Sequence, residues 1–374
     1  MKQMKFVGAL SCAGLALACQ HASAQSSVTL YGVADVSVRY LTNANAANDN
    51  RLYMTNGAIT NSRFGMRGTE DLGGGYSAIF KLESGINLQD GTDSSRLFNR
   101  AAYVGLSGPY GTVTLGRQMT PLFDALGNTY DPLTVGNYFE NAWLPVALGA
   151  GLYADNAVKY VGSFAGLSID AMYSFGTDTT VTGPGGFSGQ IPGHMGAGNM
   201  YGVTLSYTIG QLSFGGGVQQ NSDNSNRKQT TFNANAVYTF SAVGVYLGYL
   251  HSKDDTGFVD NTLAQQPIAA SIDDLKNTGR IDDGPYTGVT WQLSPALRLT
   301  GAFYYDHMKN ASIGGGVLGS GNRYTGVALA EYSLSKRTEV YGTVDFNKVT
   351  GAGTVELPGR SNQTGVAIGM RNIF

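Results

Sequence analysis

Cysteine is nearly missing from this 374-residue chain, and its two copies, Cys12 and Cys19, both lie within the first 24 residues. The rest of the chain therefore has no disulfide, no thiolate metal site and no cysteine nucleophile. Charge is scarce too, because Asp, Glu, Lys and Arg make up 13% of the residues, against about 25% in an ordinary soluble domain. After residue 24 no run of about 18 apolar residues occurs, which excludes transmembrane helices.

Glycine and tyrosine are abundant instead, with 53 and 22 copies against 10 prolines and 2 tryptophans. This usage favours many short strands and tight turns over helices. The mean hydropathy is −0.10, so the chain is neither strongly polar nor strongly apolar. Low charge, middling hydropathy and pervasive alternation of apolar and polar residues together indicate a membrane β-barrel, whose strands are half apolar and half polar.

The first 24 residues have the features of a secretory leader. Lys2 and Lys5 provide a positive start, residues 6–19 are small and apolar, and Ala22-Ser23-Ala24 is a small-residue cleavage pattern. We therefore expect a cleaved signal peptide over residues 1–24 and a single barrel domain over residues 25–374. Without the leader, 22 basic side chains stand against 26 acidic ones, a net charge of −4, and nothing points to nucleic acid as a partner.

The last ten residues, 365–374, alternate with the period of a β-strand, since successive side chains point to opposite faces. Val366, Ile368 and Met370 fall on one face together with the terminal Phe374. A lone amphipathic strand at a chain end is a sticky edge that is normally covered or paired. We therefore expect this strand to pair with the first strand, 28–40, and to close the sheet.

Alternating segments recur along the chain, joined in turn by tight turns and by long polar loops. The expected strands are 28–40, 61–69, 76–85, 99–106, 112–118, 156–163, 167–176, 200–209, 211–220, 230–240, 243–252, 284–293, 297–308, 322–333, 338–348 and 365–374. Short turns on one side and long loops on the other are typical of outer-membrane barrels. The prediction is an all-β, 16-stranded antiparallel transmembrane β-barrel, wide enough to leave a water-filled channel.

Several stretches carry a more specific likeness, namely 28–32, 62–73, 155–160, the block 99–118 and the terminal Phe374. They resemble the trimeric general porins of Gram-negative bacteria, most closely the betaproteobacterial type. The resemblance implies a homotrimer in the outer membrane, surrounded by its lipids, that passes small hydrophilic solutes and ions. It also implies a third loop, here 119–154, that folds into the barrel. Phe374 resembles the signal that the barrel-assembly machinery reads.

Four basic residues, Arg39, Arg63, Lys81 and Arg100, fall on the polar register of four consecutive strands. A charged side chain on the lipid face at mid-bilayer costs about 2–4 kcal/mol, so we expect these four in the lumen, as a basic wall of the pore constriction. Arg63 and Arg100 also match the family. The alternative is that some of the charges only solvate the lumen or form local pairs, such as Asp35 with Arg39 or Lys81 with Glu83.

The third loop carries three acids, Asp124, Asp131 and Glu140, which an inward-folded loop would set opposite the basic wall. Opposed charges across a water-filled constriction produce a transverse field that orients solutes and sets ion preference. Which of these acids point inward, and whether the pore prefers anions or cations, stays open at this stage.

An outer-membrane enzyme of the phospholipase or protease type is the alternative, and it requires a histidine within reach of a nucleophile. Only His194, His251 and His307 remain after the leader, and they lie in a glycine-rich loop or at strand ends. No metal spacing or cofactor-binding glycine loop stands out, so neither an enzyme nor a cofactor is expected. An adhesin barrel is a further alternative, which predicts a closed pore.

Overall fold

A computed structural model describes residues 27–92, 96–134, 138, 151–176, 189–264 and 279–374. The expected leader, residues 1–24, lies outside the described residues, and so does Glu140. The described part of the chain forms a single sheet of seventeen strand segments. The strands are β1 (Ser27–Leu41), β2 (Arg51–Asn56), β3 (Arg63–Gly73), β4 (Tyr76–Gly85), β5 (Ala101–Gly108), β6 (Gly111–Met119), β7 (Tyr153–Phe164), β8 (Leu167–Ser174), β9 (Met200–Ile209), β10 (Leu212–Ser222), β11 (Lys228–Phe240), β12 (Val243–Asp254), β13 (Arg280–Gln292), β14 (Leu297–Ser312), β15 (Leu318–Ser333), β16 (Thr338–Gly351) and β17 (Asn362–Ile373).

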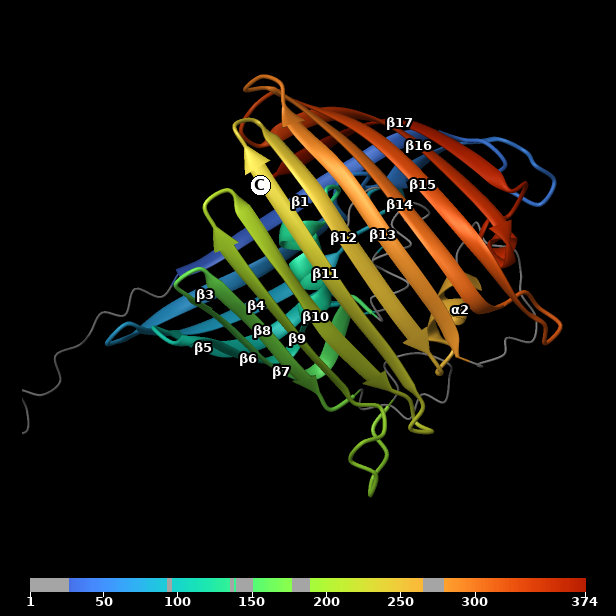
Figure 1. Ribbon diagram of the computed structural model, residues 1–374. Coiled ribbons are helices and arrows are strands. Elements are labelled where there is room, and N and C mark those ends of the chain that lie inside the picture. Colours follow the sequence, from blue (N-terminus) through green and yellow to red (C-terminus); the bar gives the residue numbers. More distant parts are fainter. Residues whose placement is uncertain (1–26, 93–95, 135–137, 139–150, 177–188, 265–278) are drawn as a thin grey trace, which may run out of the picture.

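The sheet closes on itself into a barrel, which Figure 1 shows as a ring of inclined strands. From β3 onward, each strand pairs antiparallel with the next one in sequence, and β1 pairs with both β3 and β17. β2 and β3 lie end to end beside β1, because β2 pairs with Val36–Leu41 and β3 with Ser27–Val33. The seventeen segments therefore fill sixteen positions in the wall, which confirms the predicted 16-stranded antiparallel barrel.

Closure takes place where the sequence predicts it, between the two ends of the chain. The pairs run from Val33 opposite Ile373 to Leu41 opposite Gly365. Beyond them, Gly32 and Phe374 exchange two backbone hydrogen bonds of 3.0 and 3.1 Å. β1 therefore has β17 on one side and β2 and β3 on the other, so neither terminal strand of the described sheet is left as an open edge.

Alternation along each strand separates an apolar outer face from a largely polar inner one. On β17, for example, Val366 and Ile368 are exposed on the outside, whereas Ala367 between them is buried. Apolar side chains are also buried inside the barrel. There, Leu126, Tyr130 and Tyr138 from the connection between β6 and β7 pack against wall residues such as Tyr304 and Tyr341. The hydrophobic core thus lies between an inward-folded connection and one side of the wall.

The long connections contain more regular structure than the sequence indicates. The polar stretch 42–60, expected as a loop, includes β2, whose outward Leu52 and Met54 continue the apolar face beside β1. Other connections carry short helices. These are α1 (Pro121–Ala125), the π-helix η1 (Leu126–Tyr130), α2 (Phe258–Ala264) and the 3-10 helix η3 (Ala352–Glu356).

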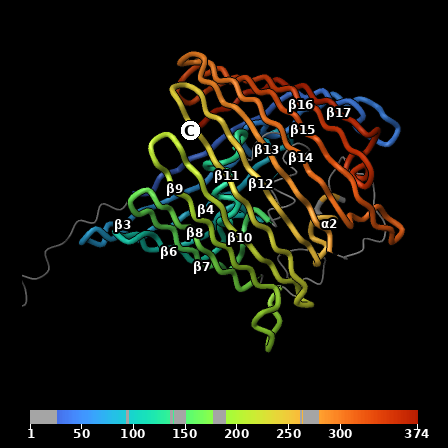
Figure 2. The backbone as a smooth tube through the Cα atoms, in the orientation of Figure 1, coloured from blue at the N-terminus to red at the C-terminus, as the bar shows by residue number. Residues whose placement is uncertain are grey.

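Connection length divides the barrel into two unlike ends (Figure 2). The tight turns and the C-terminus gather at one end, and the long connections gather at the other. The turn between β3 and β4 consists of Gly73, Gly74 and Gly75, with φ of 79°, 63° and 82°. Three successive residues at positive φ require glycine, because a Cβ atom is strained there. Within the described residues, no helix is both long and apolar enough to span a membrane.

Candidate functional site

The connection between β6 and β7 enters the lumen through the two helices that follow β6. Thr120 is extended, and Pro121 begins α1 at a position where its missing N–H is not needed. Leu122 and Leu126 are buried against the wall, and α1 continues directly into η1. Figure 1 shows these teal helical turns inside the ring of strands. The segment thus narrows the barrel from within, in agreement with the expected inward fold of the third loop.

Hydrogen bonds of tyrosine hydroxyls and one carboxylate hold the β6–β7 connection against strands β10, β13 and β14 of the wall. The Tyr130 hydroxyl lies 3.2 Å from the Ser213 hydroxyl on β10, and the Tyr286 hydroxyl on β13 donates to the Tyr130 carbonyl at 3.2 Å. The hydroxyl of Tyr304 on β14 donates a short hydrogen bond to the Asp131 carboxylate. The loop is therefore held by several strands.

Arg39 and Asp131 differ from the expectation that they line the constriction. The side chain of Arg39 is 0% exposed. Its guanidinium donates to both carboxylate oxygens of Asp345 at 2.6 and 3.0 Å and lies 3.7 Å from the ring centre of Tyr138. Asp131 is likewise buried. Both residues lie between loop and wall, where they hold the loop rather than meet solutes.

The other three basic residues converge on one buried carboxylate, Glu83 on β4. Its oxygens lie 2.8 Å from Arg100 Nε, 3.1 Å from Lys81 Nζ and 3.8 Å from Arg63 Nε. The Tyr31 hydroxyl donates to Glu83 at 2.7 Å. We call these five residues the Glu83 cluster. It carries three positive charges and one negative charge.

Exposure differs sharply within the Glu83 cluster. The carboxylate side chain is 2% exposed, whereas Arg63 is 25%, Lys81 28% and Arg100 11% exposed. The anion is thus covered and the cations reach the lumen. A shared buried acceptor holds their flexible stems in place, because hydrogen bonds between charged groups are short and strong.

Arg100 reaches this cluster although strict alternation would place it outside. Ala102, Val104 and Leu106 point outward from β5, and Arg100 has the same parity. Arg100 lies one residue before the start of β5, however, so the alternation of the strand does not determine its direction. Its backbone N–H donates to the Glu83 carbonyl at 3.2 Å, and its side chain turns inward.

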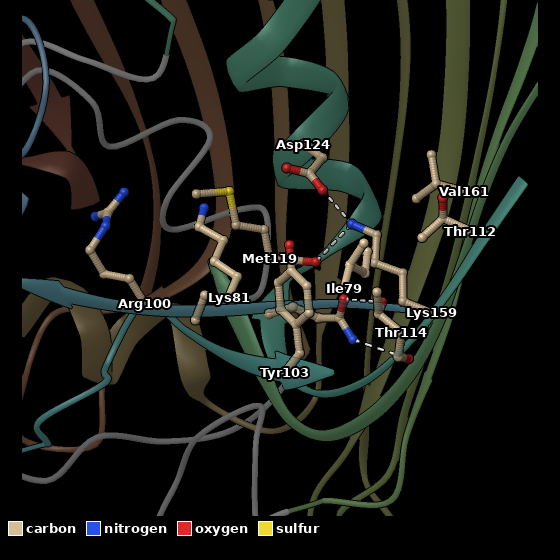
Figure 3. Close-up of a pocket in the computed structure, with 12 residues that line it drawn as sticks. Ile79, Lys81, Arg100, Tyr103, Thr112, Thr114, Met119, Asp124, Lys159 and Val161 are labelled. Atoms are coloured by element: carbon tan, nitrogen blue, oxygen red, sulfur yellow. Dashed lines mark hydrogen bonds and ion pairs between the residues drawn. The ribbon is translucent and has the colours of Figure 1, made fainter. Parts of the chain in front are cut away.

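Asp124, on α1, faces the same space as Lys81 and Arg100 (Figure 3). The three line a cavity of about 280 Å³ between loop and wall. The carboxylate of Asp124 forms a short ion pair with Lys159 on β7, and Lys159 also lies 2.9 Å from Asp170. The structure thus brings Asp124 close to the basic residues, and a nearby lysine offsets its charge.

Sequence reasoning did not select Glu83 as a site residue, and it missed Lys159 and Asp170 altogether. It also left out Arg117, whose guanidinium lies 2.6 Å from Asp155. The ladder between β6 and β7 shifts register between Gly116 and Gln118, and Gly116 has a φ of 130°. Such a bulge re-aims the side chain that follows it, so Gly116 was the available signal for Arg117.

The three histidines do not form a hydrolytic arrangement among the described contacts. His251 Nδ1 lies 2.8 Å from Asp283, and its ring stacks on Phe232. His307 Nδ1 lies 2.9 Å from the amide oxygen of Asn322. In the described part of the chain no group of three or more His, Cys, Asp or Glu side chains is placed to hold a metal ion.

Comparison with known proteins gives one consistent answer. A family model described as Gram-negative porin matches residues 10–352. Outer membrane porin protein 32 of Delftia acidovorans is 29% identical over 377 residues, which cover 94% of this chain and 95% of the relative. An outer membrane porin protein of Bordetella pertussis is 32% identical over 267 residues, covering 62% of this chain and 66% of the relative.

Solved structures share the fold. The anion-selective porin from Comamonas acidovorans superposes with a TM-score of 0.73 at 25% identity, covering 94% of this chain and all of that one. OmpT of Vibrio cholerae, solved in its trimer form, has a TM-score of 0.62 at 15% identity, covering 93% of this chain and 99% of that one.

Proposed function

This chain belongs to the Gram-negative porin family and forms a channel through the outer membrane, and we propose that this channel passes small anions in preference to cations. The observation that carries the proposal is the Glu83 cluster, whose three cations reach the lumen around one covered anion. Positive side chains around a narrow aqueous path attract anions and repel cations.

Local pairing of the loop acids supports the same sign. Asp124 is offset by Lys159, and Asp131 is buried against Tyr304, so neither presents a free negative charge to the lumen. In this proposal Arg63, Lys81 and Arg100 form the basic wall of the constriction. The similar Comamonas acidovorans protein is an anion-selective porin, which agrees with this assignment.

Reversal potential in a planar bilayer tests the proposal. With a tenfold KCl gradient across the membrane, the two ions have similar mobility in water, so the sign of the reversal potential reports which ion the pore prefers. At about 0.1 M salt the proposal predicts a reversal potential with the sign of an anion-permeable channel. At about 1 M salt the preference for anions should be weaker, because the Debye length falls from about 10 Å to about 3 Å. A potential of the opposite sign would refute it.

We further propose that the protein acts as a homotrimer, after removal of residues 1–24 and assembly through the strand that ends at Phe374. The trimer form of the OmpT structure and the paired position of Phe374 beside Gly32 support these points. Chemical cross-linking of the purified protein and N-terminal sequencing test them, with a three-fold mass and a mature start at Gln25 as the expected results.

We also propose that the barrel has no enzymatic activity. Among the described contacts, His251 lies beside Asp283 and His307 beside Asn322, and neither histidine contacts a serine or threonine hydroxyl that could act as a nucleophile. Phospholipid hydrolysis by the purified protein would contradict this.

A further inference from the structure

Six charged side chains lie buried on the inner face of the barrel, at the end with the long connections. Each of them is at most 5% exposed. Four are carboxylates and only two are guanidinium groups, so the set is acidic. We call these residues the Arg280 cluster, and they are Asp260 on α2, Arg280 and Asp282 on β13, Asp306 on β14, Arg323 on β15 and Glu356 on η3.

Arg280 joins two connection segments to the wall. Its guanidinium donates to Asp260 on α2 at 2.7 Å and to Glu356 on η3 at 3.0 Å. It also donates to Asp282 on its own strand at 2.8 Å. The helix α2 adds apolar contacts, since Val259 is 0% exposed within the main core. Figure 1 shows α2 at the end of the barrel where β12 and β13 meet long connections. The Arg280 cluster therefore seats α2 and η3 at the mouth of the channel.

Asp306 is the member of the cluster that no donor satisfies. It is 0% exposed, and in the described part of the chain neither of its carboxylate oxygens accepts a hydrogen bond. Arg323 stands opposite Asp306 in the register of β14 and β15, yet its guanidinium donates to Glu356 at 3.2 Å and to Asn347 at 3.3 Å. The group within hydrogen-bond reach of Asp306 is the carboxyl of Asp282. An ionised carboxylate can only accept, so these two groups can bond only when one of them carries a proton.

Charge counting leads to the same proton. With every group ionised, the cluster would hold two positive and four negative charges, a net charge of −2. Asp254 on β12, opposite Arg280 in register, adds another negative charge and is used by the N–H groups of Thr256 and Val259. A buried carboxylate without a counter-charge takes up a proton instead. Among the described residues, no three His, Cys, Asp or Glu side chains are placed to hold a metal ion, so the residues fit a proton better than a metal.

We propose that Asp282 and Asp306 share one proton, and that this proton is required for α2 and η3 to stay seated at the mouth. When the proton leaves, two adjacent buried carboxylates repel each other, and Asp282 can no longer serve Arg280 without cost. The seat then weakens, α2 and η3 move away from the wall, and the mouth widens as the pH rises. The proposal does not depend on which ion the channel prefers, because the Glu83 cluster lies on other strands.

Thermodynamic linkage gives the size of the effect. The seated state holds one proton more than the released state, so the ratio of released to seated channels should rise up to ten-fold for each unit of pH. Single-channel conductance at about 1 M salt, where charges are screened over about 3 Å, measures this ratio. The conductance is expected to increase reversibly between neutral pH and about pH 9, which is below the ordinary pKa values of tyrosine and lysine.

Asp306→Asn is the decisive variant, because its amide can still donate to Asp282 but cannot ionise. Its conductance should match the wild type at neutral pH and stay constant up to about pH 9. Asp283→Asn is the matched control, since it removes an acid from the next position of β13, on the outer face, and should keep the pH response. Heat-dependent gel mobility verifies that each variant has folded.

Infrared spectroscopy detects the shared proton directly. At neutral pH the wild type and Asp283→Asn should show the C=O stretching band of a protonated carboxylic acid, and Asp306→Asn should lack it. A band that Asp306→Asn leaves in place would overturn the proposal, and so would an Asp306→Asn channel that keeps the pH response. If a chelator such as EDTA raises the wild-type conductance at neutral pH, the cluster holds a divalent cation, and the proton assignment is wrong.

Discussion

Replacing Arg100 by alanine should lower the anion preference of the channel about three-fold at 0.1 M salt. The change takes the Glu83 cluster from three cations to two, while Lys81, Arg63 and the Tyr31 hydroxyl still surround the carboxylate. A unit charge about 7 Å from a permeating ion contributes about 0.6 kcal/mol in water. Screening at 0.1 M reduces this to about 0.3 kcal/mol.

Anions lose this attraction and cations lose an equal repulsion, so the difference between them changes by about 0.6 kcal/mol. That corresponds to the three-fold change in the permeability ratio. At 1 M salt the Debye length is about 3 Å, and the effect should nearly vanish. Single-channel reversal potentials in KCl gradients, measured at both salt levels, give the ratio directly.

Two further variants make this measurement decisive. Arg100→Lys keeps the charge and should retain most of the preference. Lys336→Gln removes a positive charge from the tight turn between β15 and β16, at the end of the barrel. This variant should leave the permeability ratio unchanged. A permeability ratio that Arg100→Ala leaves untouched at low salt would refute the assignment of Arg100 to the constriction.

Three other predictions concern how the barrel is held together. Arg39→Ala should destabilise the barrel by about 3–5 kcal/mol, because it leaves Asp345 as an unpaired buried charge, and it should lower the thermal unfolding temperature while leaving ion preference unchanged. Tyr304→Phe removes the hydrogen bond to Asp131, a bond worth about 1.5–3 kcal/mol, so single-channel recordings should show more current fluctuation as the loop loosens, whereas Tyr305→Phe on the outer face should not. Gly32→Val should block closure, since even a Cβ atom there would lie 2.3 Å from the Phe374 ring; the measured loss of heat-resistant barrels should be greater than for Gly342→Val, where the nearest atom is 3.9 Å away.

The faces of the strands and the closure of the barrel could be predicted because alternation is local and has a period of two. Val366 and Ile368 point outward as expected, and β17 pairs with β1 as expected. β2 was missed although Leu52 and Met54 alternate correctly, because six residues inside an Asn- and Ala-rich stretch give a weak signal. Local patterns thus determine which face a residue takes, and short strands within loops escape them.

The roles of the charged residues could not be predicted in the same way. Arg39 and Arg63 point to the same inner face from neighbouring strands, yet one is covered and the other reaches the lumen. The difference arises from Asp345, which is 306 positions from Arg39 in sequence, and from Tyr138 on the inward loop. Glu83 became the centre of its cluster because Lys81 lies two residues away on the same strand, and pairing with the neighbouring chain segments brings Arg63 and Arg100 beside it. The alternation of apolar and polar residues predicts neither which distant residues pair nor the register between strands.

Exposure separates two kinds of charge in this barrel, although both are anchored to the same wall. The covered charges, Arg39 with Asp345 and Asp131 with Tyr304, are satisfied within the protein and fix the position of the loop. The cations of the Glu83 cluster share one carboxylate between three of them, and in our proposal the remaining charge acts on solutes. Changes to the first kind should therefore alter stability and the steadiness of the current, whereas changes to the second should alter its sign preference. A variant of the Arg39–Asp345 pair that reversed ion preference with stability intact would show that this division is false.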